Sequence, residues 1–587
     1  MSVTLSAELS ARLRLALDKA GHPTTAAEVV PAADTRFGDY QSNVAMLLAK
    51  QLGRPPREIA GDIIAALEVD DLSLPPEIAG AGFVNFRISP ACLAQKLAEL
   101  QSDPDRLGLS PAENPRTIVI DFSSPNVAKP MHVGHIRSTI LGDCLTRLAR
   151  FAGHRVITDN HLGDWGTQFG KVIYGWKHFL DRDALTRDPI SELVRLYREV
   201  HAIEEAEAAA RKLAVENGEP EPPSPVTVSA RLELVALQRG DEENHAIWRQ
   251  TVDLSRREFE KIYARLGITF DHYLGESFYN DALAPLVDRL LETGVATKSQ
   301  GAVCLFFEEV PALADKPCII RKSDGGFLYA TTDLATLEYR VASWHPDAIW
   351  YVTGAPQQLH FQQVFAAAQK IGIQADLQHV AFGSILGEDR RMMKTRSGDN
   401  VLLVGLLDEA ISRAAEVVAA KNADLQPEEQ RLVAETIGIG AVKYAELSQH
   451  RMTDYVFSWD KMLSFQGNTA PYLQNAYVRI RSIFRKLDTP FVPDGPIELT
   501  SPAERQLALK LIQFAEEIPV ALEQFRPNAL ATYLFSLANL FHTFYEECPV
   551  LRSEGRTRES RLALCDLTAQ VLRRGLELLG IGVLEKM

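Results

Sequence analysis

Two histidines, a glycine and a lysine stand close together in SSPNVAKPMHVGHIRSTILGD, residues 123–143. His132 and His135 are three positions apart where a loop changes into a helical pattern, so both rings can face one side of the first helical turn. The first N–H groups of a helix have no partner within it and favour anions. The segment therefore predicts a phosphate site, with imidazole donors, Lys129 as a nearby cation, and Gly134 leaving room for a flat ring.

An isolated pair of histidines with this spacing is also explained by helix capping and packing. The neighbouring elements favour the functional interpretation. An apolar strand pattern, TIVIDF, precedes the loop, and a helix pattern ending near Gly153 and a second strand, HRVITDN, follow it. This order predicts a parallel βαβ unit, and hence the start of a doubly wound α/β domain that positions the histidines at a strand–helix junction.

The rest of the chain divides around this unit into three predicted domains. Residues 1–112 form a small α+β domain, which ends at the proline-bearing stretch LGLSPAENPR. Residues 113–402 form the α/β domain, with a helical insertion at about 181–265, read as a hairpin around the linker NGEPEPPSPVT. PCIIRK, AIWYVTGA and HVAFGSIL are expected to complete its sheet, and residues 403–587 are expected to be all-helical.

Composition excludes several classes of protein. The 587 residues are 46% hydrophobic and 24% charged, as in ordinary globular proteins, and the net charge of −15 argues against a wholly basic nucleic-acid-binding surface. The six cysteines include no CxxC pair, so no zinc site and no disulfide framework are expected. No apolar run is long enough to span a membrane and the N-terminus lacks a signal pattern, so a cytoplasmic protein is expected.

The motifs resemble those of a known family. HVGH at a strand–helix junction is similar to the HIGH sequence of class I aminoacyl-tRNA synthetases, and the longer string with NHLGDWGTQFG resembles the arginyl-tRNA synthetases of that class. FGDYQSN and GAGFVNFRI resemble their N-terminal domain, and FGSILGEDRRMMKTRSGDNV resembles their second nucleotide loop. GIGAVKYAELSQHR and FQGNTAPYLQNAYVRI resemble their helical C-terminal domain.

The resemblance implies a Rossmann-like catalytic domain and an all-α anticodon-binding domain. It implies that ATP, accompanied by Mg²⁺, and L-arginine form an adenylate and pyrophosphate, after which arginine passes to the terminal ribose of tRNA(Arg). Such a reaction depends on positioning and charge stabilisation. The residues implied for ATP binding and catalysis are Lys129, His132, Gly134, His135, Lys394 and Arg396. A monomer is expected.

The second nucleotide loop departs from the usual KMSKS pattern. It reads MMKTRS and lacks the first lysine, so the resemblance implies that Lys129 supplies that charge. Lys394 and Arg396 are then candidates for holding pyrophosphate, with their alignment to the two usual lysines left open. A basic surface turn is the alternative explanation of KTR.

Arginine recognition requires acceptors for a planar cation with five donors, and a carboxylate is its bidentate partner. Tyr329 and Asp333 are four positions apart and share one face if their segment is helical. The residues that match the family's arginine contacts are Asn126, Glu276, Tyr329, Asp333 and Gln357. Surface hydrogen bonding is the alternative for each of them alone.

Two segments are candidates for RNA contact. Residues 461–486 contain five basic side chains and no acidic one, and a helix there would place two polar flanks outward. The flanks comprise Asn475, Arg479 and Lys486 on one side and Gln474, Arg481 and Arg485 on the other. In the N-terminal domain, alternation predicts Phe83, Asn85 and Arg87 on the exposed face of a strand. A solvated basic helix and an edge strand are the respective alternatives.

Two other functions are alternatives to that of an arginyl-tRNA synthetase. A small-molecule nucleotidylyltransferase shares an HxGH site, but it has no need of the helical C-terminal third. A non-catalytic, tRNA-binding paralogue is disfavoured by the presence of Lys129, His132, His135, Lys394 and Asp333.

Overall fold

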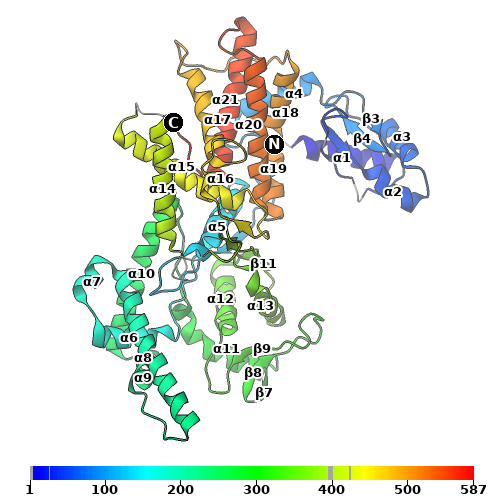
Figure 1. Cartoon of the computed structure of the whole chain (residues 1–587). Coiled ribbons are helices and arrows are strands. Elements are labelled where there is room, and N and C mark those ends of the chain that lie inside the picture. The colour runs from blue at the N-terminus through cyan, green and yellow to red at the C-terminus, as the bar shows by residue number, and fades with distance from the viewer. Residues whose placement is uncertain (1–3, 25–26, 33, 394–400, 422–424) are drawn as a thin grey trace.

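The structure is a computed structural model that describes residues 4–24, 27–32, 34–393, 401–421 and 425–587. A small N-terminal α+β domain lies to one side of a long helical C-terminal part, and a central α/β domain with inserted helices lies below both (Figure 1). The predicted fold class is confirmed. Within the described residues no helix combines the length and the apolar character that crossing a membrane requires.

The central sheet is parallel and is covered on both faces. Its order is β11-β10-β5-β6, with bounds β5 (Thr117–Asp121), β6 (Arg155–Asp159), β10 (Ala348–Tyr351) and β11 (Asp376–His379). Ile118 and Ile120 share a core with α5 (Val133–Phe151), whereas Val119 packs into a second core with α11 (Asn280–Glu292), α12 (Tyr329–Trp344) and α13 (Gln358–Lys370). Burial on both faces explains the continuous apolar runs of these strands.

Two predicted strands of this sheet lie elsewhere. PCIIRK forms β9 (Cys318–Arg321), which joins β7 (Thr297–Ser299) and β8 (Ala302–Leu305) in a separate antiparallel sheet. Ile319 is exposed between the buried Cys318 and Ile320, as in a sheet with one face in solvent. Of HVAFGSIL, only His379 belongs to the central sheet, as the last residue of β11, and the end of the stretch forms β12 (Ile385–Leu386), which pairs with β13 (Tyr455–Val456). An apolar run predicts a strand, but it does not indicate which sheet the strand enters.

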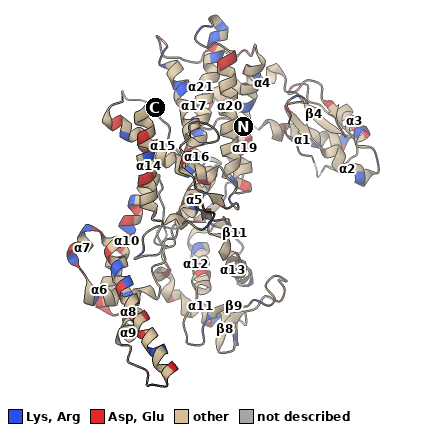
Figure 2. Ribbon diagram, in the orientation of Figure 1, with Lys and Arg blue, Asp and Glu red and all other residues tan. Residues whose placement is uncertain are grey.

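The insertion contains more helix than the predicted hairpin. After α6 (Gln168–Phe179), its helices are α7 (Arg182–Arg187), α8 (Pro189–Asn217), α9 (Pro225–Gln238) and α10 (Glu242–Leu266). The sequence interpretation missed α9, whose Pro225 occupies a first-turn position that proline favours. Figure 2 shows acidic and basic residues intermixed along the ribbons of α8, α9 and α10.

The N-terminal domain corrects one predicted side-chain orientation. Its elements are α1 (Leu5–Lys19), β1 (Val30–Pro31), β2 (Tyr40–Ser42), α2 (Val44–Leu52), α3 (Pro56–Ala66), β3 (Glu77–Ala79), β4 (Phe83–Phe86) and α4 (Pro90–Ser102). The predicted exposure of Asn85 is wrong, because only 3% of this residue is accessible. β4 is an inner strand between β2 and β3, and the chain at Gly38 passes beside Asn85. Phe83 is half-buried and Arg87 is exposed.

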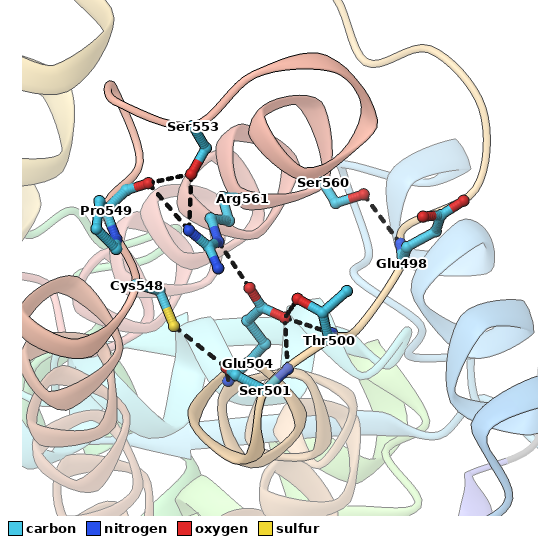
Figure 3. Close-up of polar contacts among 9 residues, drawn as sticks. All are labelled: Glu498, Thr500, Ser501, Glu504, Cys548, Pro549, Ser553, Ser560 and Arg561. Carbon is cyan, nitrogen blue, oxygen red and sulfur yellow. Dashed lines mark hydrogen bonds and ion pairs between the residues drawn. The ribbon is translucent and has the colours of Figure 1, made fainter.

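The C-terminal part is helical, as predicted. Its helices are α14 (Leu403–Lys421), α15 (Pro427–Leu447), α16 (Trp459–Met462), α17 (Ala470–Phe484), α18 (Pro502–Ile512), α19 (Phe514–Glu523), α20 (Pro527–Glu547) and α21 (Gly555–Leu578). The buried Glu504 completes a capping box with Ser501 and pairs with Arg561 at 2.7 Å, which fixes the start of α18 against α21 (Figure 3). Arg505 then pairs with Asp39 and attaches the N-terminal domain to α18.

Candidate active site

The loop after β5 is held in an unusual backbone conformation. Ser123, Ser124 and Ala128 have positive φ angles of 75°, 46° and 61°. Ser138 Oγ accepts a hydrogen bond from the Ser123 N–H at 2.8 Å, and Asn160 Oδ1 accepts one from the Ser124 N–H at 3.0 Å. Non-glycine residues keep such angles only where neighbouring groups enforce them, which is common at functional sites. The loop thus carries its side chains in one fixed arrangement over the ends of the strands.

His132 and His135 cap the start of α5 and keep one ring nitrogen free. Nδ1 of His135 accepts the His132 N–H at 3.1 Å, and Nδ1 of His132 accepts the Gly134 N–H at 3.1 Å. In each neutral ring the proton must therefore be on Nε2, which can donate to another group. Burial lowers the pKa of His135 to about 4, with a further contribution from His132, so this ring is neutral at pH 7. A Cβ on Gly134 would lie 2.8 Å from His132 Cε1, so the capping geometry itself requires glycine.

A cavity of about 210 Å³ lies beside these histidines. It is mostly apolar and opens between α5 and the segment before the second nucleotide loop. Its lining residues are His132, Val133, Gly134, Arg137, Gly354, Pro356, Phe382, Gly383, Ser384, Ile385, Met392 and Met393. The buried Arg137 pairs with Glu446 of α15 at 3.0 Å, so the wall of this cavity is tied to the C-terminal helices. Its mostly apolar lining suits a flat, uncharged ring.

A second cavity, of about 410 Å³, contains all five side chains predicted to bind arginine. Tyr329 and Asp333 come from the first turns of α12, Glu276 from the short helix η1 (Glu276–Tyr279), Gln357 from η2 (Ala355–Gln357) and Asn126 from the loop after β5. The remaining lining residues are Asp121, Ser124, His161, Gly163, Thr332, Tyr351, Thr353, His360 and Phe361. Tyr329 is 71% exposed and stands at the mouth of the cavity.

The second cavity is strongly acidic. Burial, followed by repulsion from the Asp164 and Asp333 carboxylates, raises the pKa of Glu276 to about 8. Asp333 Oδ2 lies 2.6 Å from His360 Nε2. Burial lowers the pKa of His360, but the contact with Asp333 raises it more, so the net pKa is above the usual value. A cation bound beside Glu276 would favour its ionised form, because an opposite charge lowers the pKa of a carboxyl group.

Lys129 is exposed and lines neither cavity. Its Nζ lies 5.8 Å from the ring centroid of Tyr197 in α8, and its charge contributes, after burial, to the lowered pKa of His132. Lys394 and Arg396 lie outside the described residues.

Comparisons with known proteins follow the same division of the chain. Residues 100–459 match a family model described as class I tRNA synthetases (R), catalytic domain. Residues 7–88 match the arginyl tRNA synthetase N-terminal domain, and residues 473–587 match the DALR anticodon binding domain. Proteins named arginine–tRNA ligase from a Synechococcus species and from Chromobacterium violaceum are 45% and 43% identical over 99% and 100% of both chains. The chain belongs to the class I arginyl-tRNA synthetases.

Solved structures agree with this assignment. An arginyl-tRNA synthetase from Plasmodium falciparum aligns with a TM-score of 0.84 at 29% identity and covers 100% of both chains. One from Thermus thermophilus aligns with a TM-score of 0.83 at 25% identity, over 99% of this chain and 100% of its own.

Sequence reasoning missed several polar residues of the synthetase's acidic cavity. Arg340 of α12 is fully buried and pairs with Asp121 at 2.6 Å and with Asp159 at 2.8 Å, joining the ends of β5 and β6 beneath the cavity. It follows Asp333 by seven positions, a helical spacing that places both on the same side of α12 and that could have revealed it. His360 follows Gln357 by three positions and was detectable in the same way.

The helix α17 presents fewer RNA-facing groups than predicted. Gln474 is fully buried and donates to the carbonyl of Gly582 at 2.8 Å, so its predicted exposure is wrong. Asn475 and Arg479 are exposed, and Arg479 lies 5.2 Å from the ring centroid of Tyr545 on α20. The C-terminal residues 579–587 pack against α17 and occupy the flank on which Gln474 had been expected to be exposed.

The basic groups near the end of α17 contact the same terminal segment. Arg481 pairs with Glu585 at 3.1 Å, Arg485 donates to the Glu585 carbonyl, and Lys486 is exposed beyond the helix end. Arg485 is exposed as well, so the terminal segment leaves cationic surface available around Glu585.

Proposed function

We propose that the acidic cavity binds L-arginine and that the smaller cavity binds the adenosine of ATP. The chain is an arginine–tRNA ligase and uses ATP as a substrate. The observation that carries the site assignment is that Asp333 and Glu276, from separate elements, line one cavity beside the histidine-capped start of α5. Carboxylates bind the positively charged guanidinium through paired hydrogen bonds. Few other amino-acid side chains have both the charge and the number of donors to pair with two carboxylates.

The two cavities share a wall, which supports a direct reaction between their occupants. Gly354 and Pro356 line the smaller cavity and Gln357 lines the larger one. We assign Asn126 and Gln357 to the backbone end of arginine, so that its carboxylate faces the α-phosphate of ATP. Attack by this carboxylate forms arginyl-adenylate and releases pyrophosphate. A hydroxyl of the 3′-terminal ribose of tRNA(Arg) then attacks the adenylate carbonyl, which forms the arginyl ester and releases AMP. Holding these groups in line supplies much of the catalysis.

The charge of the phosphates is met by donors from α5 and its loop. The Nε2–H groups of His132 and His135 are free to donate to phosphate oxygens, and Lys129 provides a mobile cation nearby. Lys394 and Arg396 remain predicted pyrophosphate contacts. Among the described residues no cluster of three or more His, Cys, Asp or Glu side chains could hold a metal ion. We propose that Mg²⁺ enters with ATP, bound mainly through the phosphates.

The remaining assignments concern RNA and the organisation of the chain. We propose that Asn475, Arg479, Arg481, Arg485 and Lys486 contact the anticodon arm, and that Phe83 and Arg87 contact the outer part of the tRNA. We retain 1–112, 113–402 and 403–587 as the functional divisions. We propose a monomer as the active unit. We propose the cytoplasm as its location.

The test of the assignment is ATP–pyrophosphate exchange measured with each of the twenty amino acids, with and without bulk tRNA. We expect exchange with arginine alone. Exchange with another amino acid would overturn the interpretation of the acidic cavity. No exchange with any amino acid, in protein shown to be folded, would favour a non-catalytic RNA-binding role.

Arginine binding should strengthen as the pH rises towards 8. Glu276 has a pKa of about 8 in the empty cavity, so it is mainly protonated at pH 7, whereas a bound guanidinium favours its ionised form. Binding therefore releases a proton, and the Kd for arginine should rise by up to about tenfold per pH unit below 8. Calorimetry between pH 6 and 9, in buffers of different ionisation enthalpy, measures both effects. In the Glu276→Gln variant, arginine binding should no longer release this proton. If the pH dependence of binding is unchanged in that variant, the released proton comes from His360.

Replacing Arg479 with alanine should weaken tRNA binding uniformly rather than alter base preference. Its guanidinium is exposed on α17, where a phosphate can reach it. The slope of log K against log salt concentration should decrease by about 1 if one phosphate contact is lost. Arg289→Ala is the matched control, because Arg289 is an exposed arginine paired with Glu338 on the catalytic domain. Equal effects of the two changes would contradict an RNA contact by Arg479.

A further inference from the structure

The segment that carries Glu276 is held by a carboxylate outside the cavity. Asp164 is buried, with 5% of the residue accessible, and does not line the cavity. Its Oδ1 accepts the Ser277 N–H at 2.8 Å and its Oδ2 accepts the Ser277 hydroxyl at 2.7 Å. Ser277 directly follows Glu276 in η1, whose first N–H groups have no partner within the helix. A residue more than a hundred positions away therefore caps the turn that presents Glu276.

The backbone around Asp164 is built for this contact. The Asp164 carbonyl accepts the indole N–H of Trp248 from α10 at 2.8 Å. The Leu162 carbonyl accepts the Glu276 N–H at 3.0 Å, so the two segments also run together through their main chains. A Cβ on Gly275 would lie 2.4 Å from the carboxyl group of Asp164. Only glycine at that position lets the turn approach this closely.

We propose that Asp164 is a positioning residue for arginine specificity, which fixes the Glu276 carboxylate through Ser277 and maintains the negative field of the cavity. The proposal rests on the assignment of the acidic cavity to arginine. A carboxylate on a short turn has several rotamers and backbone positions, and a bidentate partner must be placed closely to be effective. The Asp164 carboxylate also places negative charge beside Glu276 and does not occupy the cavity that the substrate needs.

The effect of the Asp164 charge on Glu276 can be separated from the effect of Asp164 on the structure of the turn. Burial is the first cause of the raised pKa of Glu276, and Asp164 and Asp333 are the next. The titratable groups around this carboxylate are Asp164 and His161 after β6, Asp333 on α12 and His360 on α13. Removing the Asp164 charge while keeping its shape should therefore lower the pKa of Glu276. A purely structural cap would leave that pKa unchanged.

The experiment compares Asp164→Asn, Asp164→Ala, Ser277→Ala and Glu276→Gln in arginine-dependent exchange with bulk tRNA, from pH 6 to 9. Asp164→Ala should raise the KM for arginine about tenfold or more, and Ser277→Ala less, while the KM for ATP stays within about twofold. As the pH falls, the KM for arginine should begin to rise at a lower pH in Asp164→Asn than in the unaltered protein. Thermal melting identifies any variant that fails to fold, in which case Ser277→Ala and Asp164→Asn carry the test.

The outcomes distinguish this inference from the function on which it rests. If Glu276→Gln leaves the arginine KM unchanged, the assignment of the cavity to arginine is wrong. If Glu276→Gln raises that KM while Asp164→Ala and Ser277→Ala do not, the positioning role of Asp164 is wrong. An Asp164→Asn profile identical to that of the unaltered protein would refute its electrostatic contribution.

Discussion

Replacing Asp333 with asparagine should lower kcat/KM for arginine by roughly 100-fold or more, the cost expected when one partner of a buried charge pair is lost (about 3 kcal/mol). The substitution keeps the size of the side chain but removes the charge that we propose binds the guanidinium. It also removes the charged partner of His360 Nε2, now 2.6 Å away. Because Asp333 lines only the acidic cavity, the KM for ATP should change little.

The measurement is exchange kinetics with arginine and ATP varied separately. Glu338→Gln is the matched control, since Glu338 lies on the same helix but pairs with Arg289 at the surface. Surface pairs contribute little, so this control should behave like the unaltered protein. An arginine KM and kcat that Asp333→Asn leaves intact would refute the assignment of Asp333.

Replacing Lys129 with alanine should lower the single-turnover rate of adenylate formation by about 10²–10³-fold, as for loss of a group that stabilises transition-state charge. The second nucleotide loop lacks the first lysine of the usual pattern, and Lys129 is the cation immediately before the histidine pair. Its side chain is exposed and contacts only the ring of Tyr197 among the described interactions, so it is able to turn towards phosphate.

Lys171→Ala provides the control for this prediction. Lys171 lies 5.4 Å from the same Tyr197 ring centroid but pairs with Glu204, so its loss reproduces any effect of the Tyr197 contact without touching the nucleotide site. Rapid-quench measurement of adenylate formation separates the chemical step from tRNA binding. A near-normal rate for Lys129→Ala would show that the missing charge comes from elsewhere.

Much of the catalytic core was predictable from local patterns. TIVIDF, the helix after HVGH and HRVITDN form the βαβ unit, because buried parallel strands and an amphipathic helix leave strong periodic signals. His132 and His135 also cap the helix start, which the sequence offered only as the alternative to a phosphate site. The five residues assigned to arginine came from the family resemblance rather than from any pattern, and the structure brings them to one cavity.

Side-chain exposure was predicted less well, for a physical reason. Asn85 and Gln474 occupy positions that alternation and helical periodicity place outward, yet both are buried. In each case a segment distant in sequence covers the residue: the chain near Gly38 lies beside Asn85, and the C-terminal residues near Gly582 cover Gln474. Periodicity describes one element at a time, whereas burial depends on what packs against it.

The sequence by itself determined the βαβ unit, the position of the histidine pair at a helix start and the family. Tertiary structure alone decided which sheet PCIIRK joins, that Arg340 links Asp121 to Asp159, and that Asp164 caps the turn carrying Glu276. Local preferences act over a few residues, but an acidic cavity is formed by side chains from several elements. Their convergence depends on how the sheet and its helices pack, which no short stretch of the chain encodes.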